Sequence, residues 1–151
     1  MTTMARLSSR DDLEKLRKEI VEKHDPERKA VAVCAGTGCV AYGSYKLTDA
    51  FRDEVKKLGL DVEIRATGCH GFCERGPLVV VYPQKIFYQR VKPKDVGEIL
   101  EKTVGEGQVI ERLLYDDPVT GEKHTYEDDV PFYKYQQRLI LGNNGRIDPT
   151  S

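Results

Sequence analysis

Two pairs of cysteines constrain this chain more than any other feature of its sequence. Cys34 and Cys39 are separated by four residues, and Cys69 and Cys73 are separated by three. Each pair lies in a glycine-rich segment next to a short apolar run, and such a run is typical of a buried strand. The four thiols therefore belong to two loops, which a folded domain has to bring together before they can act as one site.

Apolar patterning predicts a parallel strand–helix–strand unit around these loops. Residues 29–34 and 61–66 form short strand-like runs, and residues 44–58 carry apolar side chains at helical spacing. A crossover helix between two parallel strands leaves both loops at the carboxyl ends of the strands, along one edge of the sheet. We therefore expect the four thiols to converge, although a whole helix separates the two pairs in the sequence.

The next segment predicts an antiparallel hairpin and a closing helix. Residues 78–82 and 86–91 are strand-like, and a helix is expected to begin at Pro93 and to end before Gly105. The resulting order, β-α-β-β-β-α, is that of a thioredoxin-like α/β fold. The predicted domain thus combines a parallel βαβ unit, an antiparallel hairpin and a closing helix, with a helix before it and an irregular tail after it.

Three parts of the chain are expected to differ in organisation. Residues 1–28 form an N-terminal helical segment, residues 29–107 the thioredoxin-like domain, and residues 108–151 a tail or connector. The apolar face of the N-terminal helix, predicted over residues 10–24, is made by Leu13, Leu16, Ile20 and Val21. The aromatic side chains of the tail are Tyr115, Tyr126, Phe132, Tyr133 and Tyr135. Aromatic side chains among acidic turns predict a surface for a partner.

Charge and composition exclude several classes of protein. The 151 residues include 24 Lys and Arg against 25 Asp and Glu, so the chain lacks the positive charge of a general nucleic-acid-binding protein. Its longest apolar run, residues 78–82, is far shorter than the ~20 residues of a membrane-spanning helix, and the N-terminal residues lack the apolar core of a secretory signal. We therefore expect a cytoplasmic protein with no nucleic acid and no direct membrane insertion. In that compartment, cysteines favour metal or redox chemistry over disulfides.

Several metal centres use four thiols, and their usual ligand spacings differ. Structural zinc sites commonly use C-x-x-C pairs in small ribbons, whereas both pairs here are wider. A [4Fe-4S] cluster often takes three cysteines from one C-x-x-C-x-x-C run, which this chain does not contain. A [2Fe-2S] cluster needs two thiolates for each iron, and two pairs in separate loops suit that demand. Zinc in a structural or interaction module stays the first alternative.

Other patterns in the cysteine loops allow further interpretations. Residues 36–41 fit the dinucleotide-binding pattern G-x-G-x-x-A, with Glu63 near the place of a ribose-binding acid, yet Cys39 interrupts this loop. A thiol–disulfide oxidoreductase needs a C-x-x-C pair at a helix start, and neither pair has that spacing. His70, beside Cys69, is expected on the solvent side, either as a neighbour that tunes the site or as an ordinary exposed loop residue.

At these residues the sequence resembles the thioredoxin-like [2Fe-2S] ferredoxin domain. The resemblance rests on VAVCAGTGCVAYGS, on TGCHGFCERGPLVVVYP and on a Y-x-x-V before a helix. The most similar version stands at the N-terminus of the flavoprotein subunit of bacterial NADH dehydrogenases and of NAD(P)-linked hydrogenases and formate dehydrogenases. In that subunit a connector follows this domain, and the tail of the present chain resembles it at VIERLLYDDPVTGE and VPFYKYQQRLILGNNGRIDP. The difference lies at Asn144, which stands where the connector usually has a cysteine.

The resemblance, which covers about residues 29–149, implies a function and a set of partners. It implies that the ligands of a [2Fe-2S] cluster are Cys34, Cys39, Cys69 and Cys73. The chain is then a one-electron carrier without a catalytic site of its own, in a module or subunit of an NAD(P)H-linked oxidoreductase of the NADH dehydrogenase or hydrogenase type. FMN and NAD(P) are expected only in a partner chain or in a missing domain. The expected partners are this flavoprotein and other iron–sulfur subunits of a multisubunit complex.

Overall fold

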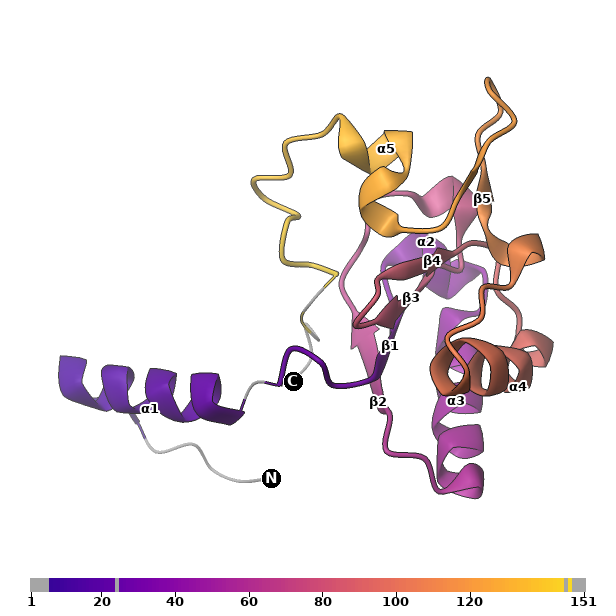
Figure 1. Cartoon of the computed structure of the whole chain (residues 1–151). Coiled ribbons are helices and arrows are strands. Elements are labelled where there is room, and N and C mark those ends of the chain that lie inside the picture. Colours follow the sequence, from indigo (N-terminus) through magenta and orange to yellow (C-terminus); the bar gives the residue numbers. More distant parts are fainter. Residues whose placement is uncertain (1–5, 24, 146, 148–151) are drawn as a thin grey trace.

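A four-stranded mixed sheet forms the centre of the molecule. The structure is a computed structural model and describes residues 6–23, 25–145 and 147 (Figure 1). The strands lie in the order β2-β1-β3-β4 and are β1 (Ala30–Cys34), β2 (Glu63–Thr67), β3 (Val79–Tyr82) and β4 (Ile86–Tyr88). β1 and β2 run parallel, whereas β3 is antiparallel to both β1 and β4. The predicted parallel unit and the predicted hairpin are both confirmed.

Helices connect the strands as the periodicity predicts. α3 (Ser44–Leu58) joins β1 to β2, and a short helix, α2 (Thr37–Ala41), precedes it directly after β1. The closing helix starts as a 3-10 turn at Pro93–Asp95, continues as α4 (Val96–Glu98) and ends as a wider π-helical stretch at Ile99–Gly105. The element order is therefore the thioredoxin-like order expected from the sequence.

One face of the sheet carries the larger apolar cluster. Strand side chains alternate between the two faces, so Val31 and Val33 of β1 share this face. Helical residues from α3 and from the closing helix cover them: Leu47, Phe51, Val96, Ile99 and Leu100. Because burial of each large apolar side chain stabilises a fold by roughly 1.5–3 kcal/mol, this layered core accounts for much of the stability of the domain.

The opposite face holds a smaller cluster that includes two of the cysteines. Its strand residues are Ala32, Cys34, Val80 and Phe87. The side chains that cover them are Cys39, Phe72, Leu78, Tyr115, Val130 and Tyr133. Three of these covering residues lie after position 107, so the second face is closed largely by the C-terminal part of the chain.

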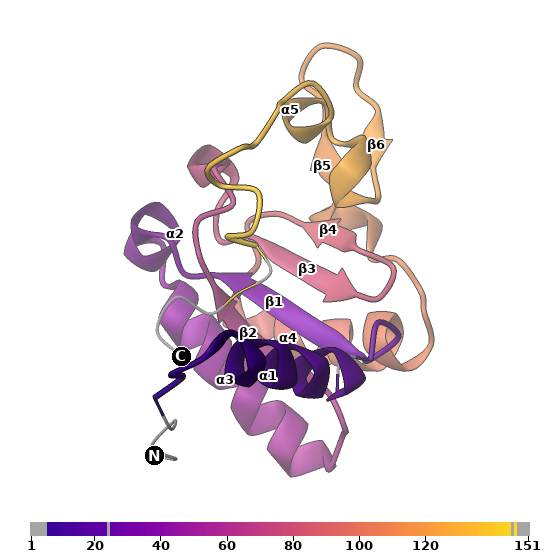
Figure 2. The same ribbon diagram turned by 90° about the vertical axis from the view of Figure 1, so that its left-hand side faces the viewer.

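The C-terminal segment, residues 108–145, packs back onto the domain. Its elements are the hairpin of β5 (Tyr115–Asp116) and β6 (Lys123–His124) and the short helix α5 (Pro131–Lys134). Figure 2 shows them beyond β4, on one side of the sheet. Ile110, Leu113 and Leu114 join the larger apolar cluster from this segment. The predicted domain boundary at residue 107 stays a prediction. Apolar side chains from both sides of this boundary pack in the same core.

The two outer edges of the sheet differ. At β4, the backbone N–H of Phe87 donates to the carbonyl of Thr125 at 2.8 Å, and Ile86 forms a bridge with Tyr126. The C-terminal segment therefore closes this edge. At β2, the half-buried Arg65 donates to Glu63 of the same strand at 2.7 and 2.8 Å. The β2 edge thus carries a charged pair.

The N-terminal helix stands apart from the sheet. α1 (Arg10–Lys23) confirms the predicted helix, and Figure 1 shows it extending away from the domain. Leu13, Ile20 and Val21 of its predicted apolar face are exposed. Among the described residues, no helix is both long and apolar enough to cross a membrane.

Candidate metal centre

The four cysteines follow the carboxyl ends of the parallel strands. Cys34 is the last residue of β1, and Cys39 lies in α2. Cys69 follows the end of β2, and Cys73 begins a 3-10 turn. Cys34 lies opposite Thr67 in the β1–β2 register, so the two loops leave the sheet side by side. The expected convergence of the two loops is confirmed.

Two glycines allow these loops to touch. A β-carbon on Gly36 would lie 2.8 Å from the β-carbon of Cys69, and one on Gly38 would lie 2.9 Å from that of Cys73. A real side chain does not fit at such distances, so both positions require glycine. The G-x-G-x-x-A pattern therefore has a structural explanation here, because its two glycines admit the second cysteine loop.

The thiols meet as two neighbouring pairs. Cys69 Sγ and Cys73 Sγ are 3.8 Å apart, and hydrogen bonding joins the thiols of Cys34 and Cys39. Within the described part of the chain, no three His, Cys, Asp or Glu side chains gather closely enough to hold a single metal ion. A [2Fe-2S] cluster takes two thiolates on each of its two irons, so a pair of thiol pairs fits its donor set.

The two pairs differ in exposure. Cys34 and Cys39 are fully buried, whereas Cys69 and Cys73 are half-buried. The backbone N–H of Gly71 donates to Cys69 Sγ at 3.3 Å. Such hydrogen bonds to ligand sulfur are among the features that tune an iron–sulfur site. The second pair is therefore the side of the site that lies nearer to solvent.

The two thiols of the buried pair have different pKa values. Hydrogen bonding with the Cys39 thiol lowers the pKa of Cys34 to about 5. The same contact, together with burial, raises the pKa of Cys39. In the half-buried pair, burial and then the Cys69 thiol raise the pKa of Cys73. Cys34 is thus the thiol of the buried pair that loses its proton more readily, and the thiolate is the form that binds a metal.

His70 is buried, which corrects the expectation that it faces solvent. Its side chain is 1% exposed. Its Nε2 lies 3.0 Å from Thr67 Oγ1, and its Nδ1 lies 2.9 Å from Glu127 Oε1. Arg138 donates to the backbone carbonyl of His70 at 2.9 Å. Because Glu127 and Arg138 belong to the C-terminal segment, His70 ties that segment to the second cysteine loop.

Aromatic rings line the site on the side of the C-terminal segment. Phe72, from the second cysteine loop, stacks on Phe132 with ring centroids 4.2 Å apart. Tyr133 meets Phe72 edge-on at 6.1 Å and meets Phe87 of β4 edge-on at 5.7 Å. Rings packed in this way exclude water and fix one another's orientation.

The aromatic residues of the tail divide into two groups. Tyr115 and Tyr133 are buried and Phe132 is half-buried, whereas Tyr126 and Tyr135 are exposed. The expectation of a partner surface is therefore wrong for Tyr115 and Tyr133, and it stays a prediction for the two exposed tyrosines. Scattered aromatic residues without periodicity do not reveal which of them turn inward.

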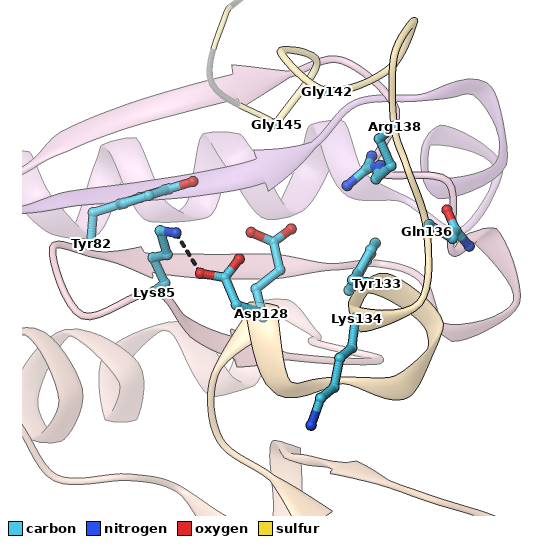
Figure 3. Close-up of a pocket in the computed structure, with 10 residues that line it drawn as sticks. Tyr82, Lys85, Asp128, Tyr133, Lys134, Gln136, Arg138, Gly142 and Gly145 are labelled. Atoms are coloured by element: carbon cyan, nitrogen blue, oxygen red, sulfur yellow. Dashed lines mark hydrogen bonds and ion pairs between the residues drawn. The ribbon is translucent and has the colours of Figure 1, made fainter.

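The hydroxyl of Tyr133 has no hydrogen-bond partner among the described residues, although it is buried. Burial raises the pKa of Tyr133, and Glu127 raises it further, so the hydroxyl keeps its proton at neutral pH. The guanidinium of Arg138 lies over the ring, 5.1 Å from its centroid. Figure 3 shows both side chains at a pocket that is also lined by Lys85 and Asp128, which form an ion pair.

Comparison with known proteins identifies the domain. The family model described as "Thioredoxin-like [2Fe-2S] ferredoxin" matches residues 19–104. The chain belongs to this family. A 2Fe-2S ferredoxin of Clostridium pasteurianum is 38% identical over 77 residues, which cover 50% of this chain and 76% of that protein. A 2Fe-2S ferredoxin of Aquifex aeolicus is 40% identical over 79 residues, which cover 50% of this chain and 71% of that protein.

Solved structures of this family share the fold. The crystal structure of the wild-type thioredoxin-like [2Fe-2S] ferredoxin from Aquifex aeolicus is similar with a TM-score of 0.54 and 36% identity, over 60% of this chain and 99% of that one. A cysteine-to-serine variant of the same protein is similar with a TM-score of 0.54 and 35% identity, over 59% and 99% of the two chains. The protein is therefore a ferredoxin, an electron carrier whose cofactor is a [2Fe-2S] cluster.

Proposed function

We propose that Cys34, Cys39, Cys69 and Cys73 bind the [2Fe-2S] cluster, with one pair on each iron. The observation that carries this proposal is the meeting of two thiol pairs at one sheet edge, with Gly36 and Gly38 at points where the two loops come closest. The bound cluster supplies one-electron transfer. The chain itself supplies thiolates, backbone donors and a wall of apolar side chains that keeps water from the buried pair.

Replacement of each cysteine by alanine tests the ligand set. Wild-type protein purified without oxygen is expected to hold about two iron and two sulfide per chain. Each alanine variant is expected to lose most of this iron together with its visible absorption. Thr37→Ala is the control, because Thr37 is an exposed residue between Cys34 and Cys39. A cysteine variant that keeps full iron and an unchanged electron paramagnetic resonance spectrum would remove that cysteine from the ligand set.

Metal analysis separates this proposal from the zinc alternative. A zinc site in the same four thiols would give a colourless protein, because zinc has no redox chemistry and a filled d shell. One zinc per chain and no iron, in protein made with both metals present, would favour a structural or interaction module.

The same cluster is proposed to serve an NAD(P)H-linked oxidoreductase of the NADH dehydrogenase or hydrogenase type, as a module or subunit. The resemblance of the tail to a connector before a flavin-binding domain supports this role. The exposed apolar residues Leu139 and Ile140 offer a contact surface at the end of that tail, and Tyr135 lies close to them in the sequence. FMN and NAD(P) would then be bound by the partner.

Electron exchange with a flavoprotein tests the proposed role. The chain, reduced and mixed with the FMN-containing subunit of a bacterial NADH dehydrogenase, is expected to transfer its electron in a rapid-mixing experiment. A variant with Leu139→Ser and Ile140→Ser is expected to transfer more slowly at an unchanged iron content. The chain alone is expected not to oxidise NADH with an artificial acceptor. Turnover of NADH by the isolated chain would instead revive the dinucleotide-binding interpretation.

A further inference from the structure

Tyr133 belongs to the apolar cluster that contains two of the cysteines, and its buried hydroxyl has no partner in the described part of the chain. Tyr133 is 7% exposed, and its hydroxyl reaches neither solvent nor any hydrogen-bond partner among the described residues. Buried hydroxyl groups in native proteins are almost always paired. The natural partner of this group is therefore something that the described part of the polypeptide does not supply.

The ring of Tyr133 is held in place from several sides. Phe72 and Phe87 meet it edge-on, and Arg138 lies over its face (Figure 3). The ring also belongs to the apolar cluster that contains Cys34 and Cys39. The ring is thus a fixed part of the cluster that contains the buried cysteine pair, and its hydroxyl cannot turn freely to find another partner.

The chemistry of the hydroxyl suits a sulfur acceptor. A tyrosine hydroxyl is protonated at neutral pH and has one hydrogen to donate. Thiolate and sulfide sulfur accept hydrogen bonds. Reduction adds negative charge to an iron–sulfur cluster, so a donor near sulfur stabilises the reduced form more than the oxidised form.

We propose that the Tyr133 hydroxyl donates a hydrogen bond to a sulfur atom of the bound cluster and thereby raises its reduction potential. The proposal rests on the ligand set proposed above. Tyr133 lies beyond residue 104, where the match to the family model ends. The C-terminal segment would therefore add a tuning group to the domain that the family shares.

The variant Tyr133→Phe tests this role in the full chain, because it removes one oxygen and leaves the packed ring. Its reduction potential is measured by mediated titration followed by electron paramagnetic resonance. At a fixed potential, the ratio of reduced to oxidised cluster is expected to fall about tenfold, which for a one-electron couple is a shift of about 59 mV to lower potential. Tyr135→Phe is the matched control, since Tyr135 is 82% exposed, and its potential is expected to stay unchanged.

A second measurement places the hydroxyl directly and does not depend on that variant. 3-Fluorotyrosine is incorporated at position 133 alone, next to an otherwise unchanged site. Electron–nuclear double resonance on the reduced protein is expected to show coupling of this fluorine to the cluster spin. The same probe at position 135 is expected to show none.

The outcomes separate this proposal from the ligand assignment. If the cysteine assignment fails, the alanine variants keep their iron. If the role of Tyr133 fails, Tyr133→Phe keeps both full iron and the wild-type potential, or the fluorine at position 133 shows no coupling. Either of these two results overturns the proposal, whereas a lowered potential at full iron content together with the coupling supports it.

Discussion

The two cysteine pairs depend on the C-terminal segment in different ways, because apolar side chains of that segment cover the first pair, whereas polar contacts hold the loop of the second. Cys34 and Cys39 sit at the end of β1 and in α2, and both are fully buried. The half-buried second loop is held through His70, whose ring pairs with Glu127, 57 residues away. The comparison shows that the first pair is covered by the packing of residues 115–133, whereas the second also needs single polar contacts, some of them made by residues after 134.

Glycine contacts in the second loop lead to the same conclusion. A β-carbon on Gly68 would lie 3.1 Å from the β-carbon of Asn144, and one on Gly145 would lie 2.8 Å from the His70 ring. The end of the C-terminal segment therefore lies against the loop that carries Cys69. Changes at this end of the segment should disturb the second pair before they disturb the first.

The largest effect is expected from removing the C-terminal segment. A chain that ends at Gly107 loses six buried apolar side chains: Ile110, Leu113, Leu114, Tyr115, Val130 and Tyr133. At roughly 1.5–3 kcal/mol each, their combined loss is about as large as the ~5–15 kcal/mol by which most domains are stable. We expect this chain to be largely unfolded by circular dichroism and to hold little iron. A folded, red-brown truncated protein would instead establish residues 29–107 as the independent domain.

A shorter truncation sharpens the comparison. A chain that ends at Lys134 keeps these six residues but loses Arg138, Asn144 and Gly145, which contact the second loop. It is expected to fold and to bind its cluster, yet to release iron to a chelator several times faster than the full chain. An unchanged release rate would show that residues after 134 do not protect the second pair.

Serine replacements should distinguish the two pairs directly. Cys34→Ser places a harder oxygen ligand in a fully buried position, and we expect cluster assembly to fall to a small fraction of wild type. Cys73→Ser makes the same change where the site is half-buried, and we expect a larger part of the cluster to survive with an altered spectrum. Iron content and visible absorption measure both variants. Equal losses would mean that exposure does not decide how well each pair tolerates the change.

The link between His70 and Glu127 should have a moderate effect. Glu127→Ala leaves the buried imidazole without one of its partners, at a cost of about 1–3 kcal/mol in the free energy of unfolding. The matched control is Asp128→Ala, because Asp128 pairs with Lys85 at an exposed site and such pairs contribute only ~0–1 kcal/mol. Chemical denaturation of the two variants measures the difference. Similar losses of stability in both variants would show that the contact between His70 and Glu127 does not hold the second loop in place.

The smallest effect is expected at the strand that leads to the second pair. Arg65 lowers the pKa of Glu63 on β2 below its usual value of 4.5. The carboxylate therefore contributes stability above pH 4.5, and this contribution is lost as the pH falls through the lowered pKa of the folded state. Because the pair is partly exposed, we expect less than ~1 kcal/mol. Glu63→Gln should flatten the decline of stability in acid by that amount, measured by denaturation at several pH values.

The strands and helices of the sheet and its covering layer can be predicted from the periodic spacing of apolar residues. The alternation of Val31 and Val33 and the helical spacing of Leu47 and Phe51 are confirmed as one face of the sheet and its covering helix. The meeting of the two cysteine loops also follows from the sequence, because parallel strands end at the same edge. The first of these features depends on residues near to one another in the chain, and the second on a general rule of sheet topology.

The features that the sequence does not reveal depend on distant partners. A histidine in a glycine-rich loop is expected to be exposed, yet His70 is buried because Glu127 and Arg138 reach it from the C-terminal segment. Tyr133 stands in a stretch without periodicity, so nothing in the sequence indicates that it packs in the same cluster as two of the cysteines. The helix α1 is predictable, but its amphipathic pattern does not show that Leu13 and Ile20 remain exposed.

The closed edge of β4 also bears on how the protein behaves at high concentration. The backbone of Thr125 and Tyr126 pairs with β4, a strand whose side chains are apolar and buried. An unpaired strand of this kind is a template for pairing with other copies and for aggregation. The C-terminal segment therefore protects the β4 edge from pairing with other chains. Its partial unfolding in a cell would expose an aggregation-prone strand edge as well as the cysteine site.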